Sequence, residues 1–443
     1  MSTKYTYKEI WLISYPVLIS LIMEQIIGMT DTAFLGRVGE IELGASAIAG
    51  IYYLAIYMMA FGFSIGAQIL IARRNGEKKY KEVGSIFYQG VYFLLALATT
   101  MYILSKYLSP YLFKDIITST HIYDASLNYI NWRILGFFFS FITVMFRAFF
   151  VGTTQTKTLT LNSIIMVLSN VVFNYILIFG KFGFPKLGIA GAAIGSSLAE
   201  FVSMLFFIIY TWKHIDCRKY ALNKFPTFNP VILKHILGVS LWTMIQNLLS
   251  MSTWLMFFLF VEHLGERALA VTNIIRNVSG IPFMITMAFA TTCGSLISNL
   301  IGAGDLQYVQ GTIKQHIRIT YAFVLPLLIC FCLFPQIILS IYTDIPQLQQ
   351  ASIPSLWVLC SGYLFTVPCN IYYQSVSGTG NTRTALAIGM FVLAIYIVYI
   401  TYIILYLKVD VALCWTTEHV YAILTLILSL CYIKRGNWQK RKI

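Results

Sequence analysis

Twelve long apolar runs, separated by short polar segments, constrain what this chain can fold into. A helix that crosses a bilayer needs about 20 consecutive apolar residues, and each run reaches that length. The runs predict helices at 10–35, 44–72, 86–108, 127–150, 160–180, 189–212, 232–261, 268–300, 314–342, 354–377, 385–407 and 411–433. They are continuous and lack the two-residue alternation of barrel strands. The sequence therefore predicts an all-α polytopic membrane protein with twelve transmembrane helices.

The composition excludes the common soluble classes. Of 443 residues, 58% are hydrophobic and 11% are charged, whereas soluble domains carry about 25% charged residues. A cytosolic enzyme, a disulfide scaffold and a nucleic-acid-binding domain are therefore not expected. No metal-ligand cluster, nucleophile–base constellation or ATP-binding lysine loop occurs. We expect no catalytic residues and no cofactor, and ATP is not expected as the direct energy source.

The basic residues predict the orientation in the membrane. The net charge is +14, and cytoplasmic loops of membrane proteins carry an excess of Lys and Arg. With a cytoplasmic N-terminus, 22 of the 31 basic residues fall on the cytoplasmic side. Both termini are therefore predicted to be cytoplasmic.

The sequence contains an internal repeat with a shift of 226 residues. Gly152–Thr158 aligns with Gly378–Thr384, with four identities in seven positions, and Gly39-Glu40 aligns with Gly265-Glu266 in the same register. Each copy holds six spans, an even number, so both copies enter the membrane in the same direction. The prediction is two six-helix bundles related by a pseudo-two-fold axis along the membrane normal. Transporters built in this way bind substrate between their halves and alternate access by rocking.

The repeat also predicts the domain boundaries. We expect an N-lobe at 1–212, a charged linker with two prolines at 213–230, and a C-lobe at 231–443.

Polar and acidic side chains inside the N-terminal spans are candidates for ion coupling, because ionisable groups in a membrane are costly and usually functional. Asp31 and Glu24 are seven residues apart and share a helix face. Counted from the helix ends, Asp31, Asn174 and Ser196 are expected at one depth, with Glu24, Asn170 and Glu200 nearer the midplane. The set is Glu24, Asp31, Asn170, Asn174, Ser196 and Glu200. Carboxylate, amide and hydroxyl oxygens at one depth suit Na⁺, and a buried carboxylate also suits proton carriage.

Two charged residues of the C-terminal spans are predicted to form an ion pair. Arg276 and Glu418 are expected at matching depth, and an isolated charge there would be costly. The alternative is that each faces a water-filled cavity alone.

Several motifs together resemble the multidrug and toxic compound extrusion (MATE) transporters. Met29–Gly36 is similar to the helix 1 signature of that family, and Asn170–Pro185 resembles helix 5 and the following loop of its bacterial drug/sodium branch. Gly188–Ala193 and Gly378–Thr382 also fit. The resemblance covers the whole chain, and the order and spacing of the motifs make it specific.

The resemblance implies export of amphipathic, often cationic compounds in exchange for Na⁺ or H⁺. The family's N-lobe cation site maps onto Asp31, Asn170 and Asn174, with Ser196 where some members have threonine. Some sodium-coupled members carry acidic residues in helices 7 and 10, where this chain has Ser250 and Thr366. Coupling is therefore expected to depend on the N-lobe, and Glu24 is an addition to the basic signature.

The implied setting is the cytoplasmic (inner) membrane of a bacterium, with small molecules and the lipid bilayer as partners, no nucleic acid, and a monomeric chain. The alternative is a lipid-linked oligosaccharide flippase of the same superfamily. A flippase should have a strongly cationic cavity, whereas the intramembrane charges recognised in the N-terminal half are mostly acidic. A membrane-embedded enzyme and a channel are less consistent with the two-lobed repeat.

Overall fold

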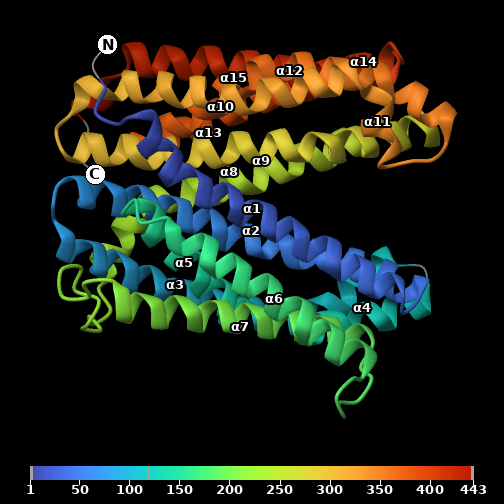
Figure 1. Ribbon diagram of the computed structural model, residues 1–443, viewed down its shortest axis with the longest axis horizontal. Helices are drawn as coiled ribbons and strands as arrows, with labels where there is room; N and C mark the ends of the chain where they lie inside the picture. The colour runs from blue at the N-terminus through green and yellow to red at the C-terminus, as the bar shows by residue number, and fades with distance from the viewer. Residues whose placement is uncertain (1–2, 118, 441–443) are drawn as a thin grey trace. The chain divides into compact units, whose positions relative to one another are not determined.

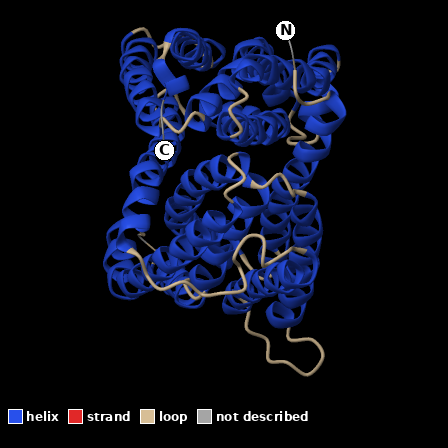
Figure 2. Ribbon diagram, turned by 90° about the vertical axis from the view of Figure 1, so that its left-hand side faces the viewer, coloured by secondary structure: helices blue, strands red, loops and turns tan. Residues whose placement is uncertain are grey.

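The computed structural model describes residues 3–117 and 119–440 (Figure 1). Within these residues the secondary structure is helical and contains no strand (Figure 2). Eleven helices are long and apolar enough to cross a membrane, and one bent helix pair supplies a twelfth span. All twelve predicted spans are therefore present as helices, and the all-α membrane fold is confirmed.

The first half of the chain contains seven helices. They are α1 (Tyr7–Gly36), α2 (Glu40–Gly76), α3 (Tyr80–Ile116), α4 (Thr120–Arg133), α5 (Gly136–Gly152), α6 (Lys157–Phe179) and α7 (Ile189–His214). The second half contains α8 (Pro230–Glu262), α9 (Glu266–Gly302), α10 (Val309–Leu333), α11 (Pro335–Ser340), α12 (Pro346–Gly378), α13 (Thr382–Ile400), α14 (Val411–Cys414) and α15 (Thr416–Arg435). Short 3₁₀ turns occupy Leu306–Tyr308 and Asn437–Lys440, and Thr401–Tyr406 continues α13 as a π-helix.

Two spans differ from their predicted form. The predicted helix at 127–150 is broken between α4 and α5, which meet at an angle of 51°. The predicted helix at 314–342 ends at Leu333, and the short α11 begins at Pro335. Proline lacks the amide hydrogen that a continuing helix would use and clashes with the preceding turn. Apolar composition continues through this break, so hydropathy alone overestimated the helix length.

The chain divides into two compact units. Residues Ile19–Met244 form one, which we call the N-unit, and the described residues up to Leu18 together with those from Ile245 form the other, the C-unit. In the N-unit, α7 packs against α6, α5 and α4, and α2 packs against α5 and α4. In the C-unit, α12 packs against α9, α15 and α10. Both boundaries lie inside helices, within α1 and α8, rather than in the segment at 213–230.

The internal repeat extends to the backbone conformation. The turn after α2 contains Lys78 at φ 60°, and the turn after α9 contains Gly304 at φ 78°, 226 residues later. The amides of both residues donate to the carbonyl oxygen three residues earlier at 3.1 Å. Thr154 at φ 63° and Gly380 at φ 87° form a second such pair. Left-handed backbone favours glycine, so the N-unit holds these two turns with residues that pay a conformational cost.

The segment between α7 and α8 is docked on α3. Three side chains of one α3 face, at positions 88, 89 and 92, hydrogen-bond to its backbone carbonyl groups. The bonds run from Tyr88 Oη to the Leu222 carbonyl at 2.6 Å, from Tyr92 Oη to the Pro226 carbonyl at 2.9 Å, and from Gln89 Nε2 to the Thr227 carbonyl at 2.9 Å. The segment is thus an ordered part of the N-unit.

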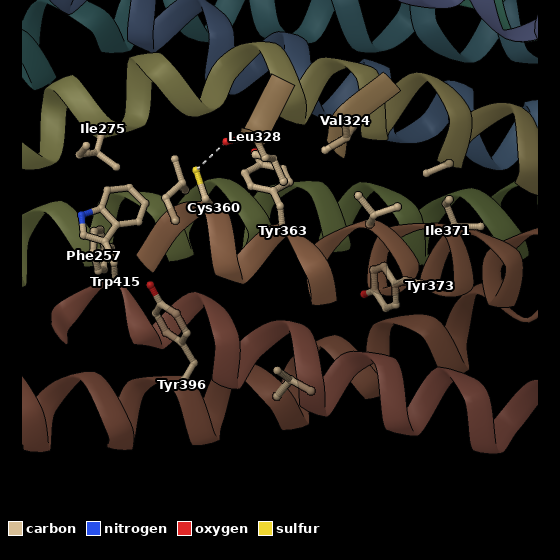
Figure 3. Packing of buried hydrophobic residues seen from close by; sticks show 14 of the residues in the cluster. Phe257, Ile275, Val324, Leu328, Cys360, Tyr363, Ile371, Tyr373, Tyr396 and Trp415 are labelled. Atoms are coloured by element: carbon tan, nitrogen blue, oxygen red, sulfur yellow. Dashed lines mark hydrogen bonds between the residues drawn. The ribbon is translucent and has the colours of Figure 1, made fainter. Parts of the chain in front are cut away.

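The core of the C-unit is built around α12 (Figure 3). Tyr363 and Ile371 of α12 are buried there, and Phe257 packs edge-on against Trp415 with ring centroids 5.2 Å apart. Such close packing of large apolar side chains fixes the relative positions of the helices that carry them.

Candidate ion-coupling site and cavity

The carboxylate of Asp31 on α1 accepts hydrogen bonds from both α6 and α7. Asn174 Nδ2 donates to Asp31 Oδ1 at 2.5 Å, and Ser196 Oγ donates to Asp31 Oδ2 at 3.2 Å. Asn170 completes a ring: its Nδ2 donates to Ser196 Oγ at 3.1 Å, and its Oδ1 accepts from Asn174 Nδ2 at 3.2 Å. Asn170, Asn174 and Ser196 are almost fully buried. Four side chains from three helices therefore converge on one carboxylate.

Small residues of α7 allow this convergence. A Cβ atom at Gly195 would lie 2.2 Å from Asn174 Oδ1, and one at Gly191 would lie 2.5 Å from the Leu177 carbonyl oxygen. Small residues let membrane helices approach closely, and here they bring α7 against α6. The glycines thus place Ser196 within reach of Asp31 and Asn170.

The amide of Asn174 has one unused group. Its Oδ1 is buried and has no hydrogen-bond partner among the described residues, while its Nδ2 donates twice. A carboxylate surrounded by N–H and O–H donors is stabilised in its ionised form. A bound cation would instead require oxygen atoms that face it, and the unused Oδ1 is such an atom.

Glu200 of α7 forms a buried ion pair with Arg133 of α4. Arg133 Nη2 donates to Glu200 Oε1 at 2.6 Å and Nη1 donates to Oε2 at 2.8 Å. The guanidinium carbon lies 3.7 Å from the centre of the Tyr53 ring, and the Tyr53 hydroxyl donates to the same carboxylate at 3.0 Å. Bidentate pairing and ring stacking use the planar geometry of arginine. A Cβ at Gly136 would lie 2.3 Å from Glu200 Oε2, so this glycine leaves room for the pair.

A second ion pair joins Glu24 of α1 to Arg147 of α5. Arg147 Nη1 donates to Glu24 Oε1 at 2.8 Å, and the two side chains are 10% and 44% exposed, with Arg147 the more buried. The guanidinium carbon of Arg147 lies 5.4 Å from the ring centre of Phe61. The more exposed carboxylate is therefore accessible to a further cation.

A cavity of about 340 Å³ lies inside the N-unit and is lined by these charged groups. Its walls include Glu24, Asp31, Arg133, Arg147 and Glu200, with tyrosine and aliphatic side chains between them. Small-molecule sites in proteins have volumes of about 300–1,000 Å³ and combine apolar walls with a few polar groups. The cavity therefore has the size and chemistry to hold a small amphipathic molecule.

The structure brings together most of the predicted site residues, in a different grouping. Asp31, Asn174 and Ser196 are in contact as expected, and Asn170 joins them rather than a second layer. Glu24 and Glu200 each have their own arginine partner. Arg133 and Arg147 were counted from the sequence among loop and helix-end charges, so the prediction of a mostly acidic N-terminal interior needs correction. Arg147 lies in the apolar run 136–152, and that position is the signal that could have identified it.

The predicted pairing of Arg276 with Glu418 is not present in the described part of the chain. Arg276 donates to Asn273 Oδ1 at 3.1 Å on an exposed face of α9, and its guanidinium carbon lies 4.9 Å from the Phe258 ring centre. Glu418 is instead half-buried near tyrosines of α12, α13 and α15. Equal depth in the membrane fixes only the position along a helix and leaves open the face on which a side chain lies.

The two positions where some sodium-coupled relatives are expected to be acidic hold hydroxyl groups bonded within their own helices. Ser250 Oγ donates to the Gln246 carbonyl at 3.0 Å, and Thr366 Oγ1 donates to the Gly362 carbonyl at 3.1 Å. Among the described residues, no cluster of three His, Cys, Asp or Glu side chains could hold a metal ion.

The model of the MatE family matches this chain twice, at residues 16–176 and 243–403. The chain belongs to the MATE family of multidrug efflux transporters. The two matches are 227 residues apart, within one residue of the shift found in the sequence. The MATE assignment and the repeat predicted from the sequence are thereby confirmed.

Individual relatives match over nearly the whole chain. A "Probable multidrug resistance protein NorM" of Thermotoga maritima is 24% identical over 98% of this chain and 94% of its own length. A solved structure described as an outward-facing conformation of a multidrug resistance MATE family transporter has a TM-score of 0.88 at 18% identity, covering 98% of this chain and 97% of its own. A MOP superfamily transporter from Pyrococcus furiosus has a TM-score of 0.87 at 19% identity, covering 98% and 97%. The fold of this MATE protein is thus that of known two-lobed, twelve-helix transporters.

Proposed function

We propose that this chain is a secondary antiporter that exports amphipathic, often cationic compounds in exchange for Na⁺ or H⁺. The observation that carries the proposal is the ring formed by Asp31, Asn170, Asn174 and Ser196, which borders a cavity large enough for a small molecule. Its setting is the inner membrane of a bacterium, as a monomer with both termini in the cytoplasm. The two units alternate access by a rocker-switch motion.

The coupling step follows from the charge of Asp31. Ionised Asp31 is held by amide and hydroxyl donors, as in this structure. When a proton or Na⁺ binds, the donors no longer suit it, and a half-turn of the Asn174 amide presents the unused Oδ1. Ion binding therefore rearranges the contact between α1 and α6, which links the ion to helix position.

Substrate competes with the ion through the shared cavity. Glu24 and Asp31 both line it, and the Glu24 carboxylate is 44% exposed. A cationic substrate is favoured by ionised carboxylates and disfavoured once a cation or proton has neutralised Asp31. This competition is the condition for exchange.

The flippase alternative would need a surplus of positive charge for a lipid phosphate. In the described residues, both cavity arginines are already paired with carboxylates, and the lining contains three acidic residues against two arginines. The charge balance therefore favours cationic substrates.

The test is dye efflux from everted vesicles, driven in turn by a Na⁺ gradient and by a pH gradient. We expect efflux with at least one gradient in wild type and with neither in Asp31→Asn. Efflux without any ion gradient, or transport of a lipid-linked oligosaccharide in place of dyes, would overturn the proposal.

A further inference from the structure

The C-unit contains a counterpart of the Asp31 site with different chemistry. In the 226-residue register, Asp31 corresponds to Phe257 and Asn170 to Tyr396. The last helix of each repeat begins at Ile189 and Val411 respectively. Counted from those starts, Ser196 corresponds to Glu418. The C-unit thus replaces the acid of its first helix by an aromatic ring and has an acid on its last helix instead.

The interactions in the two places correspond as well. In the N-unit, Asn170 of α6 donates to Ser196 of α7. In the C-unit, Tyr396 of α13 interacts electrostatically with Glu418 of α15. Phe257 packs against Trp415, which lies three residues before Glu418, and Figure 3 shows Phe257, Trp415 and Tyr396 near one another in the core of the C-unit. Glu418 therefore lies where the repeat places an ion site in the N-unit.

The surroundings of Glu418 offer no positive charge. The titratable groups that act on it are Tyr363 and Cys369 of α12, Tyr396 of α13 and Tyr421 of its own helix. In the described residues Glu418 forms no ion pair. The neighbouring His419 directs its Nε2 to Ser361 Oγ at 2.9 Å.

Two buried polar groups beside Glu418 have no partner. The Tyr396 hydroxyl and the Trp415 indole N–H belong to side chains that are 1% exposed, and neither has a hydrogen-bond partner among the described residues. Buried polar groups are normally hydrogen-bonded. Unused polar groups of this kind indicate a site that is completed by something else, such as a water molecule or an exchanging proton.

A carboxylate without a cation inside a membrane protein is costly, and it avoids the cost by binding a proton or a metal cation. Hard cations require several oxygen ligands, and the walls here are the rings of Phe257, Trp415 and neutral tyrosines. A proton needs no such ligand set. Proton binding is therefore the form of neutralisation that this environment supports.

We propose that Glu418 is a second proton-binding site, located in the C-unit, that takes up and releases a proton during transport separately from Asp31. The proton binding stands on the geometry of the C-unit alone; its use in transport rests on the antiport function proposed above. Under this proposal the two units handle the coupling ion with two different carboxylates.

The direct test is infrared difference spectroscopy of the full-length protein in proteoliposomes during a pH titration. The C=O stretch of protonated carboxylic acids should titrate in two components, of which Glu418→Gln removes one and Asp31→Asn removes the other. Glu266→Gln is the matched control, because Glu266 is an exposed carboxylate in the first turn of α9. A Glu418→Gln spectrum that superimposes on that of wild type at every pH would overturn the proposal.

A transport measurement separates the second site from the first. In Glu418→Gln, the number of protons exchanged per substrate should fall by about one, the count for a single carboxyl group, with efflux through Asp31 retained. If Asp31→Asn keeps ion-driven efflux while the Glu418 band is present, the antiport proposal fails and the proton site stands. An unchanged proton count in Glu418→Gln overturns the role in transport.

Two further variants keep the test decisive if Glu418→Gln does not fold. Glu418→Asp and Tyr396→Phe both retain or lightly alter the side-chain volume. Each should shift the titration of the Glu418 component without removing it, because the distance or the hydroxyl next to the carboxyl has changed. No shift in either variant would contradict the assignment.

Discussion

The N-unit and the C-unit share a backbone plan but distribute polarity differently. The N-unit lines a cavity with three acids and two arginines, whereas the corresponding region of the C-unit is filled by Phe257, Trp415 and Tyr396 and contains the single acid Glu418. The turns at the helix ends match residue for residue in conformation. The repeat therefore conserves the path of the chain, and the chemistry belongs to the side chains that each copy acquired.

The strongest test of this comparison is Asp31→Asn beside its C-unit counterpart, Phe257→Leu. We expect Asp31→Asn to lose ion-driven efflux down to the level of protein-free vesicles, because the titratable charge is removed at nearly constant size. Phe257→Leu should retain efflux. Measurement of dye efflux at saturating Na⁺ and at saturating pH gradient, with folded yield checked by size-exclusion chromatography, decides it. Equal effects of the two substitutions would mean that the units do not differ in this way.

The next largest effect concerns the buried ion pair, which has no equivalent at Leu359 and Leu426 in the same register. Arg133→Ala leaves Glu200 as an unpaired buried charge and should destabilise the protein by about 3–5 kcal/mol. The double variant Arg133→Ala with Glu200→Gln should recover a large part of that loss. Thermal unfolding in detergent gives the comparison. Additive destabilisation by the two substitutions would rule out the pairing.

A smaller effect is expected for Asn174→Ala, and its sign identifies the ion. Loss of the amide donor removes a hydrogen bond to a charged group, worth about 1.5–3 kcal/mol. If the ion is a proton, Asp31 keeps it to higher pH and the pH profile of efflux moves upward. If the ion is Na⁺, a ligand is lost and the half-saturating Na⁺ concentration rises roughly tenfold. A variant in which neither quantity changes would show that Asn174 has no role in ion binding.

The turns of the two units can be exchanged. Gly380→Thr copies the N-unit residue into the C-unit and should destabilise it by about 1 kcal/mol, since glycine tolerates positive φ and threonine does not. Thr154→Gly makes the reverse change, should be close to neutral, and loses only the bond from Thr154 Oγ1 to the Thr153 carbonyl. Apparent melting temperatures of the two variants measure the difference. Stabilisation by Gly380→Thr would contradict the shared turn geometry.

The smallest expected effect is at Glu24, which corresponds to Ser250 in the C-unit. Glu24→Gln should weaken binding of cationic dyes by a few-fold, because a half-exposed carboxylate contributes roughly 0.2–1 kcal/mol to an ion pair. Binding of neutral dyes should not change, and Ser250→Ala should affect neither class. Fluorescence titration with both dye classes tests this. An equal loss for cationic and neutral dyes would make Glu24 a structural residue.

The sequence predicted the spans, the repeat and the ring around Asp31, because each depends on local composition or on spacing along one helix. It did not identify Arg133 and Arg147 as cavity residues, since hydropathy does not distinguish an arginine at a helix end from one that folds back to a buried glutamate. It paired Arg276 with Glu418 on depth alone, and rotation about the helix axis was not available from the sequence. Pro335 was the local signal for the early end of α10.

The docked segment between α7 and α8 has a mechanical consequence. A strap that is held along its length by Tyr88, Gln89 and Tyr92 has no slack to release. The first part of α8 is also fixed in the N-unit, where Thr243 Oγ1 donates to the Gly62 carbonyl at 2.7 Å. Any strain that accompanies transport then falls on backbone torsions within α1 and α8, the two helices that both units share, rather than on a loop.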